Sequence, residues 1–156
     1  MDSPFARYEE KLMSSDQETN NTAIFRRFHD IVNTDDLEAI SQTIHEVVAP
    51  EALLHTPLPI TATGAEALEH VWAMLLQAFP DIHVAVEDLI AKGDRVVCRS
   101  VVTGTHKGDF HGLAPTGNSV TYNEVFFLRF ANNRITEIWG LVDTLTLRQQ
   151  LGLIPA

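Results

Sequence analysis

The sequence predicts an α+β fold in which helices pack on one face of an antiparallel sheet. In the first half, residues 20–80, apolar side chains recur at helical spacing. In the second half, residues 83–143, the period changes to two, and Val, Ile, Thr and aromatic residues become frequent. The pair Asn132-Asn133 tolerates positive φ and joins the last two strands in a tight hairpin.

Three helices are expected in the first half. The first includes residues 24–32, whose apolar members form one stripe. The second begins at Asp35 or Asp36 and is stopped by Pro50. The third reads GAEALEHVWAMLLQAF and ends at Pro80, because proline cannot continue a helix.

Four strands are expected in the second half: HVAVEDLI, DRVVCRSVVTGTH, SVTYNEVFFLRF and RITEIWGLVD. A short extended piece, EALLHTPLP, precedes the third helix and contains His55. If Asn132 and Asn133 form the loop of the hairpin, its register follows. The expected partners are Phe130 with Ile135, Phe126 with Trp139, Glu124 with Leu141, and Tyr122 with Asp143.

That register divides the hairpin into two largely apolar faces. The first combines aromatic residues with carboxylates and suits a cavity beneath the helices; it carries Tyr122, Glu124, Phe126, Leu128, Glu137, Trp139, Leu141 and Asp143. The second is plainer and suits an interface between subunits; it carries Asn123, Val125, Phe127, Ile138, Gly140 and Val142. A slip of one residue would exchange these assignments.

Length and composition favour one globular domain. The chain has 156 residues, 45% of them hydrophobic, which is enough for a sizeable core. We expect residues 1–18 to form a polar, flexible arm and residues 19–156 to form the domain. The polar, acidic N-terminus does not resemble a secretory signal, and no apolar run approaches the ~20 residues of a membrane span. We therefore expect no membrane partner.

Net charge argues about binding partners, and cysteine content argues about disulfides and the redox environment. A net charge of −10 with scattered basic residues argues against nucleic acid. The single cysteine, Cys98, excludes an internal disulfide and fits a reducing cytoplasm. It lies in an apolar strand pattern, so we interpret it as core filler.

Asp143 is the first candidate for chemistry, and two interpretations are open. It can cap the helix TLTLRQQLG, because aspartate is a preferred N-cap. Alternatively, a carboxylate surrounded by Trp139, Leu141 and Tyr122 would be desolvated, and its raised pKa would make it a general acid/base. Tyr122 is either a structural tyrosine or a donor to a substrate oxygen. Glu124 is the candidate for a second catalytic carboxylate, because burying a carboxylate without a partner is costly.

The remaining candidates are polar groups near the expected cavity mouth. His106 and His111 bracket the glycine-rich loop of TGTHKGDFHGLAPTG, and His55 can join them. The histidines His29, His45 and His70 are expected on solvated helix faces. Arg99, inside an apolar strand, either snorkels to the surface or holds Glu124 or Asp143 ionised.

No recognised metal or cofactor motif is present. The histidines lack a third ligand at a spacing such as HExxH, so we expect no metal. The sequence contains no GxxxxGK[ST] phosphate loop, no GxGxxG following a strand and no GxSxG elbow. This absence favours cofactor-free chemistry or simple binding.

Several motifs in this order resemble a known family. GTHKG with the later APTG, the RF-turn-RITEIW stretch, the aspartate four residues after Trp139, and QQLG are similar to the SnoaL-like polyketide cyclases of the nuclear-transport-factor-like superfamily. The resemblance runs from about Phe25 to Gly152. It implies a cone-shaped fold in which a curved, mostly antiparallel sheet and N-terminal helices surround a deep pocket, in a homodimer or higher oligomer. Asn132-Asn133 departs from the Asp-Gly turn usual in the family.

The resemblance also implies chemistry. In such cyclases a pocket aspartate acts as acid/base in an intramolecular aldol condensation without metal or organic cofactor; Asp143 matches its position, and His106 matches a family position more loosely. The expected substrate-binding residues, from the hairpin faces, the loops and the third helix, are Tyr122, Asn123, Glu124, Trp139, His55, His111, Arg99 and Trp72.

Two classes of function remain open at this point. The first is a cofactor-free enzyme that forms an enolate from a small apolar carbonyl compound, leading to cyclase, isomerase or lyase outcomes. The second is a non-catalytic module that binds a hydrophobic ligand or dimerises on the same fold. Water activation by Glu124 or Arg99 would instead allow epoxide hydrolysis. A shared fold does not decide among them, because function depends on the site.

Overall fold

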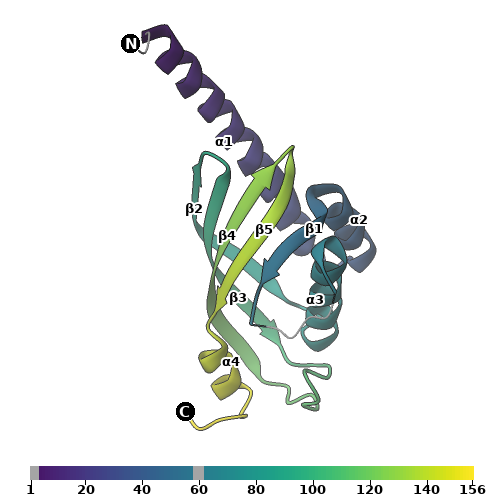
Figure 1. Ribbon diagram of the computed structural model, residues 1–156. Coiled ribbons are helices and arrows are strands. Elements are labelled where there is room, and N and C mark those ends of the chain that lie inside the picture. The colour runs from purple at the N-terminus through teal and green to yellow at the C-terminus, as the bar shows by residue number, and fades with distance from the viewer. Residues whose placement is uncertain (1–3, 58–61) are drawn as a thin grey trace.

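The fold combines four helices with one five-stranded sheet in the described part of the chain (Figure 1). The computed structural model describes the backbone of residues 4–57 and 62–156 and the side chains of residues 15–57 and 62–156. The elements are α1 Pro4–Val32, α2 Leu37–Val47, β1 Val48–His55, α3 Gly64–Ala78, β2 His83–Lys92, β3 Arg95–Thr105, β4 Ser119–Ala131, β5 Arg134–Val142 and α4 Thr144–Gln150.

The sheet is mixed, curved and open. Its strand order is β1-β5-β4-β3-β2, with β1 parallel to β5 and the other neighbours antiparallel. Helices α2 and α3 lie on one side of this sheet, and α4 follows β5 at the opposite end from the two hairpin turns (Figure 1). The α+β architecture predicted from the sequence is confirmed.

The N-terminal segment is helical where the structure describes it. Helix α1 begins at Pro4, so the backbone of residues 4–18, which we expected to be part of a flexible arm, is helical. Its N-terminal part extends past the β2–β3 and β4–β5 hairpins (Figure 1). The helix is attached to the sheet by Glu18, whose Oε1 accepts a 2.9 Å hydrogen bond from Gly93 N. Residues 1–3 of the expected arm lie outside the described residues.

The helix ends agree with the local chemistry of the sequence. Asp36 caps α2, because its Oδ1 accepts a hydrogen bond from Ala39 N at 3.1 Å. Helix α2 passes directly into β1, where Pro50 is tolerated since β1 is an edge strand. The buried face of α2 contributes Ile40 and Ile44 to the core, both with no exposed surface.

The turn of the last hairpin is as predicted, but most of its register is not. Asn132 and Asn133 have φ of 51° and 61°, and Phe130 pairs with Ile135. The register then shifts by one residue, because Thr136 of β5 has no register partner on β4. Beyond this bulge Phe126 pairs with Gly140 instead of Trp139, and Glu124 pairs with Val142 instead of Leu141.

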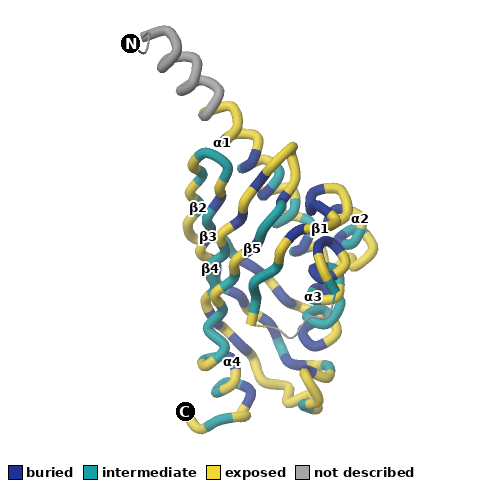
Figure 2. Tube along the Cα trace, in the orientation of Figure 1, coloured by how far each residue is buried: buried dark blue, intermediate teal, exposed yellow. Residues whose placement is uncertain are grey.

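The bulge therefore exchanges the two faces of β5 but leaves those of β4 unchanged. Tyr122 and Glu124 of β4 face the helices, together with Ile138 and Val142 of β5. Glu137, Trp139 and Leu141, which were expected on the cavity face, lie on the outer face. They share it with Asn123, Val125 and Phe127 of β4. Buried and exposed stretches interchange along β4 and β5 in Figure 2. Trp139 is 55% exposed and Leu141 71% exposed. Their assignment to the cavity is wrong.

Candidate functional site

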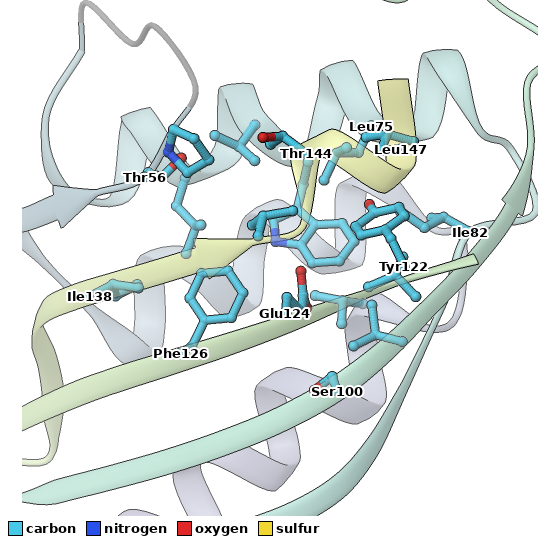
Figure 3. A pocket seen from close by; sticks show the side chains of 18 of the residues that line it. Thr56, Leu75, Ile82, Ser100, Tyr122, Glu124, Phe126, Ile138, Thr144 and Leu147 are labelled. Carbon is cyan, nitrogen blue, oxygen red and sulfur yellow. The ribbon is translucent and has the colours of Figure 1, made fainter. Parts of the chain in front are cut away.

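The concave face of the sheet and the helices enclose a cavity of about 680 Å³. Its walls are mainly apolar and come from α1, α3, α4, the inner face of the sheet, the segment after β1 and the loop between β3 and β4. Figure 3 labels lining residues from several of these parts, among them Thr56 after β1 and Leu147 of α4. A few polar or ionisable residues interrupt these walls: His29, Thr56, Ser100, His111, Tyr122, Glu124, Thr144 and Arg148. An apolar cavity with few convergent polar groups is typical of a small-molecule site.

Glu124 is the carboxylate of this cavity. It is the only Asp or Glu among the lining residues in the described part of the chain. Its side chain points from β4 into the space between sheet and helices (Figure 3). No hydrogen-bond or ion-pair partner for this carboxyl group lies among residues 15–57 and 62–156, and burial raises its pKa from 4.5 to about 7. A carboxyl group with that pKa exchanges a proton readily near neutral pH.

Tyr122 lies two residues before Glu124 on the same face of β4, and Ser100 of β3 is the register partner of Glu124. Tyr122 is 5% exposed, and the described residues offer no hydrogen-bond partner for its hydroxyl. Burial, and secondarily the Glu124 charge, raise the pKa of Tyr122 well above its ordinary value. The hydroxyl therefore stays protonated and can donate to a ligand oxygen beside Glu124.

Of the two interpretations that the sequence left open for Asp143, the cap of the last helix is confirmed. Its Oδ1 accepts a hydrogen bond from Thr146 N at 3.0 Å, and its Oδ2 accepts one from the Thr146 hydroxyl at 2.7 Å. These two bonds cap α4 and lower the pKa of Asp143, so the expectation of a desolvated carboxylate is wrong. Asp143 is half-buried and is not part of the cavity lining, whereas its neighbours Val142 and Thr144 are.

His106 is a core residue of the loop that closes the cavity. It has no exposed surface, it packs against the rings of Phe79 and Phe110, and it does not line the cavity. Its Nδ1 accepts a 3.1 Å hydrogen bond from Thr116 N, while the described residues provide no partner for its Nε2. His106 therefore has a structural role, because it holds the loop folded back on itself. Its imidazole ring does not reach the cavity, so its expected catalytic role has no geometric support.

Two more expected binding residues, His55 and Trp139, form a cluster on the outer face of the sheet. Their rings stack with centroids 4.0 Å apart, and both donate to Glu137 Oε1 at 3.1 Å. Arg129 approaches the other carboxylate oxygen of Glu137 at 3.3 Å. The bulge at Thr136 brings these side chains together, because it places Glu137 and Trp139 beside Arg129 and Phe127.

Arg99 and Asn123 also belong to the outer face. The Arg99 Nε donates to Asp88 Oδ2 at 2.7 Å, and both side chains are largely exposed. The interpretation of Arg99 as a surface residue is confirmed, and the alternative contact with Glu124 or Asp143 is wrong. Asn123 is exposed and contributes its carbonyl oxygen to Asp143 N. Water activation by Arg99 therefore has no geometric support.

Trp72 and His111 line the cavity, as does one histidine that was expected in solvent. Trp72 of α3 is 8% exposed and meets Phe28 edge to face. His29 lies on the apolar stripe of α1, stacks on Phe25 and makes a 2.7 Å hydrogen bond with Val84 O. The signal for His29 was its spacing of four residues from Phe25, which places both on one helix face.

Cys98 is also part of the inner wall. It is 3% exposed, and burial raises the pKa of its thiol to about 11. The interpretation as core filler is confirmed. Among the described side chains, no three His, Cys, Asp or Glu gather closely enough to hold a metal ion. No helix in the described part of the chain is long and apolar enough to cross a membrane.

Comparison with known proteins agrees with this geometry. The family model of SnoaL-like polyketide cyclases matches residues 22–151. The chain belongs to this family. The SnoaL-like match includes the loop of His106, the cavity strands and α4, so the resemblance seen in the motifs is confirmed.

Individual SnoaL-like relatives span most of the chain. Aklanonic acid methyl ester cyclase DnrD of Streptomyces peucetius is 26% identical over 131 residues, which are 83% of this chain and 88% of DnrD. The structure of IdmH, a proposed polyketide cyclase from Streptomyces antibioticus, is 32% identical and superposes with a TM-score of 0.69, covering 85% of this chain and 98% of IdmH.

Another similar structure belongs to a protein with a different proposed reaction. AclR, a proposed hydroxylase from Streptomyces galilaeus, is 28% identical with a TM-score of 0.76, covering 88% of this chain and 84% of AclR. SnoaL-like membership supports a cyclase or isomerase type of function. The reaction itself has to be argued from the cavity.

Proposed function

We propose that this protein is a cofactor-free acid/base enzyme that forms an enolate from a small apolar carbonyl compound. One observation supports the proposal most strongly: a carboxyl group with no partner among the described residues lies in a mainly apolar cavity and has a pKa of about 7. Glu124 is the proton acceptor in this proposal, because Asp143 is committed to capping α4.

The chemistry follows from the placement of two side chains. The Glu124 carboxylate takes a proton from the carbon next to the ligand carbonyl, and the C–H electrons move onto the carbonyl oxygen. The Tyr122 hydroxyl, on the same face of β4, donates a hydrogen bond to that oxygen as its charge develops. The apolar walls exclude water, which strengthens both interactions.

A ring closure needs one further step. The enolate carbon attacks a second carbonyl carbon of the same molecule, a C–C bond forms, and the resulting alkoxide takes the proton from Glu124. Returning the proton to a different carbon of a conjugated enolate, or to the opposite face of the same carbon, instead gives an isomerisation. The match to a relative described as an aklanonic acid methyl ester cyclase favours the first outcome.

The test uses a ketone that needs no knowledge of the natural substrate. The probe is 2-tetralone, an apolar bicyclic ketone, in D2O, with exchange of its α-protons followed by NMR. The wild-type protein is expected to accelerate exchange, and Glu124→Gln is expected to remove the acceleration while binding persists. Asp143→Asn serves as the matched carboxyl-to-amide control and is expected to retain it.

The opposite result is equally specific. Binding of 2-tetralone without faster exchange in the wild-type protein would contradict the proposal and favour a module that holds a hydrophobic ligand without catalysis. Exchange that survives Glu124→Gln and is lost in Asp143→Asn would return the acid/base role to Asp143.

We also propose that the outer face of the sheet joins two copies of the chain. Three large apolar side chains support this partner: Phe127, Trp139 and Leu141 lie next to one another in the β4–β5 pair and are all about half exposed or more. Exposed apolar groups gathered on one sheet face are typical of an interface.

A further inference from the structure

We propose that the mouth of the cavity carries an anion subsite formed by Arg148 and His111, which selects an apolar ligand bearing a carboxylate. The inference rests on the proposed function only in taking the cavity as the place where the ligand binds. It adds a charge to the ligand and an orientation within the cavity.

Arg148 is the cationic half of this subsite. It is the only Lys or Arg among the described residues that line the cavity. The described residues place no carboxylate within ion-pair distance of its guanidinium, whereas Arg27, Arg95, Arg99 and Arg129 all have such partners. Its fork of N–H donors therefore remains available, and it matches the two oxygens of a carboxylate.

The helix that carries Arg148 is firmly held over the cavity. Leu147 and Leu151 are buried beneath it, and Asp143 caps its first turn. The Gln150 side chain forms two hydrogen bonds with the backbone of Thr121, at 2.7 and 3.0 Å, as a neighbouring strand would. Helix α4 is thereby fixed to β4, so Arg148 has a defined position at the mouth.

His111 is the second half, and an uncommon backbone conformation presents it. Phe110 and Leu113 exchange two backbone hydrogen bonds across a tight turn, in which His111 has φ of 50° and Gly112 has φ of 82°. A left-handed conformation is costly for a residue with a Cβ atom. The neighbouring Asp109 accepts a 3.1 Å hydrogen bond from Gly112 N at its Oδ1, and it does not line the cavity.

Topology places both groups at one end of the sheet. Strands β3 and β5 are each antiparallel to β4, so their C-terminal ends lie at the same edge. His111 follows β3 and Arg148 follows β5, and the loop and α4 occupy the same end of the molecule (Figure 1). Asn118 of the loop donates to Gln150 O at 3.0 Å, which ties the two segments together.

The charge at the cavity mouth, where Arg148 and His111 lie, differs from the charge of the protein as a whole. The protein has a net charge of −10, which on average repels anions. Within the cavity the pattern is reversed, because a guanidinium lies at the mouth, whereas Glu124 is the only carboxyl group among the described lining residues and is mainly protonated below its pKa of about 7. A ligand carboxylate would bind at Arg148, and the apolar body would extend inward to Glu124 and Tyr122.

The test compares two probes with one aromatic skeleton. 1-Anilinonaphthalene-8-sulfonate carries an anionic group that stands in for the carboxylate, and N-phenyl-1-naphthylamine lacks it. The protein has two tryptophans, Trp72 in the cavity wall and Trp139 on the outer face. In a Trp139→Phe background, energy transfer comes from Trp72 alone, and the part of it that 2-tetralone displaces reports probe bound in the cavity.

Arg148→Gln is expected to weaken binding of the sulfonate probe roughly tenfold. Binding of the neutral probe is expected to stay the same. Arg134→Gln is the matched control, since it removes the same charge from the exposed hairpin end of β5, where no described carboxylate pairs with it. His111→Gln is expected to produce a smaller loss for the sulfonate probe alone.

Equal losses for both probes, or equal losses in the Arg148 and Arg134 variants, would overturn the anion subsite. Either result would leave the proposed function standing if the neutral probe still reaches Trp72 and Glu124 still catalyses exchange. Retained selectivity for the sulfonate probe without any exchange activity would support the subsite and contradict the proposed function, so the two failures are distinguishable.

Discussion

The Phe126 ring lies over Gly140 of the neighbouring strand, so closely that a Cβ atom on Gly140 would come within 2.4 Å of the ring. The two residues are register partners in β4 and β5, and Phe126 lines the cavity. The Phe126 ring therefore occupies the space that a side chain at Gly140 would fill. The absence of that side chain sets the width of the cavity at this point.

Gly140→Ala is predicted to push the Phe126 ring into the cavity. We expect weaker binding of N-phenyl-1-naphthylamine and a loss of about 1–3 kcal/mol in the free energy of unfolding, typical of overpacking. Fluorescence titration and denaturant unfolding measure the two effects. The double variant Gly140→Ala with Phe126→Leu is expected to recover both, and a failure of that rescue would show that the ring contact is not the cause.

The bulge at Thr136 explains why the site could be predicted only in part. Hydrophobic spacing predicted α2 and α3, Pro80 predicted the end of α3, and Asn132-Asn133 predicted the turn, whereas Pro50 lies inside β1 and does not end α2. Thr136 gave no signal, because a β-branched residue fits an ordinary strand as well as a bulge. One unpaired residue then moved Trp139 and Leu141 to the outer face.

Glu124 and Asp143 illustrate the same limit. Both are carboxylates at the expected cavity face, and only three-dimensional packing distinguishes a buried acid from a helix cap. The assignment of Tyr122 and Glu124 to that face holds, because the bulge lies in β5 and leaves the alternation along β4 unchanged. The position of His106 inside the core depends on how the loop folds back onto Thr116, which spacing does not encode.

Glu124 is predicted to make stability depend on pH. Its pKa is raised in the folded state, so the folded protein favours the protonated form. The benefit is fully present below pH 4.5 and is lost as the pH rises through about 7. The loss amounts to about 3 kcal/mol at most. Glu124→Gln should reduce the difference in unfolding free energy between these pH values, as measured by urea denaturation; an unchanged difference would contradict the shift.

Asp143 is predicted to matter for stability and not for catalysis. Asp143→Ala removes both acceptors of Thr146 and is expected to lower the Tm more than Asp143→Asn, which keeps one side-chain oxygen as an acceptor. Thermal unfolding and 2-tetralone exchange are measured on both variants. A stable Asp143→Asn protein that has lost its exchange activity would contradict the prediction that Asp143 takes no part in catalysis.

The outer face is predicted to be an interface between copies. Light scattering at micromolar concentration is expected to show a dimer, and Trp139→Lys is expected to shift it toward monomer, because a charge would be buried among Phe127 and Leu141. Ile90→Lys provides a control on the outer strand β2, where an exposed apolar residue lies away from this cluster. A wild-type monomer would contradict the assignment.

The most direct measurement is a carbon-13 NMR titration of the side-chain carboxyl groups, with the Glu124 resonance assigned by its disappearance in Glu124→Gln. The account predicts that this resonance titrates with a midpoint near pH 7, and that a neutral apolar ligand moves the midpoint further upward by removing residual water. A midpoint at the ordinary value of 4.5, unchanged by the ligand, would contradict it.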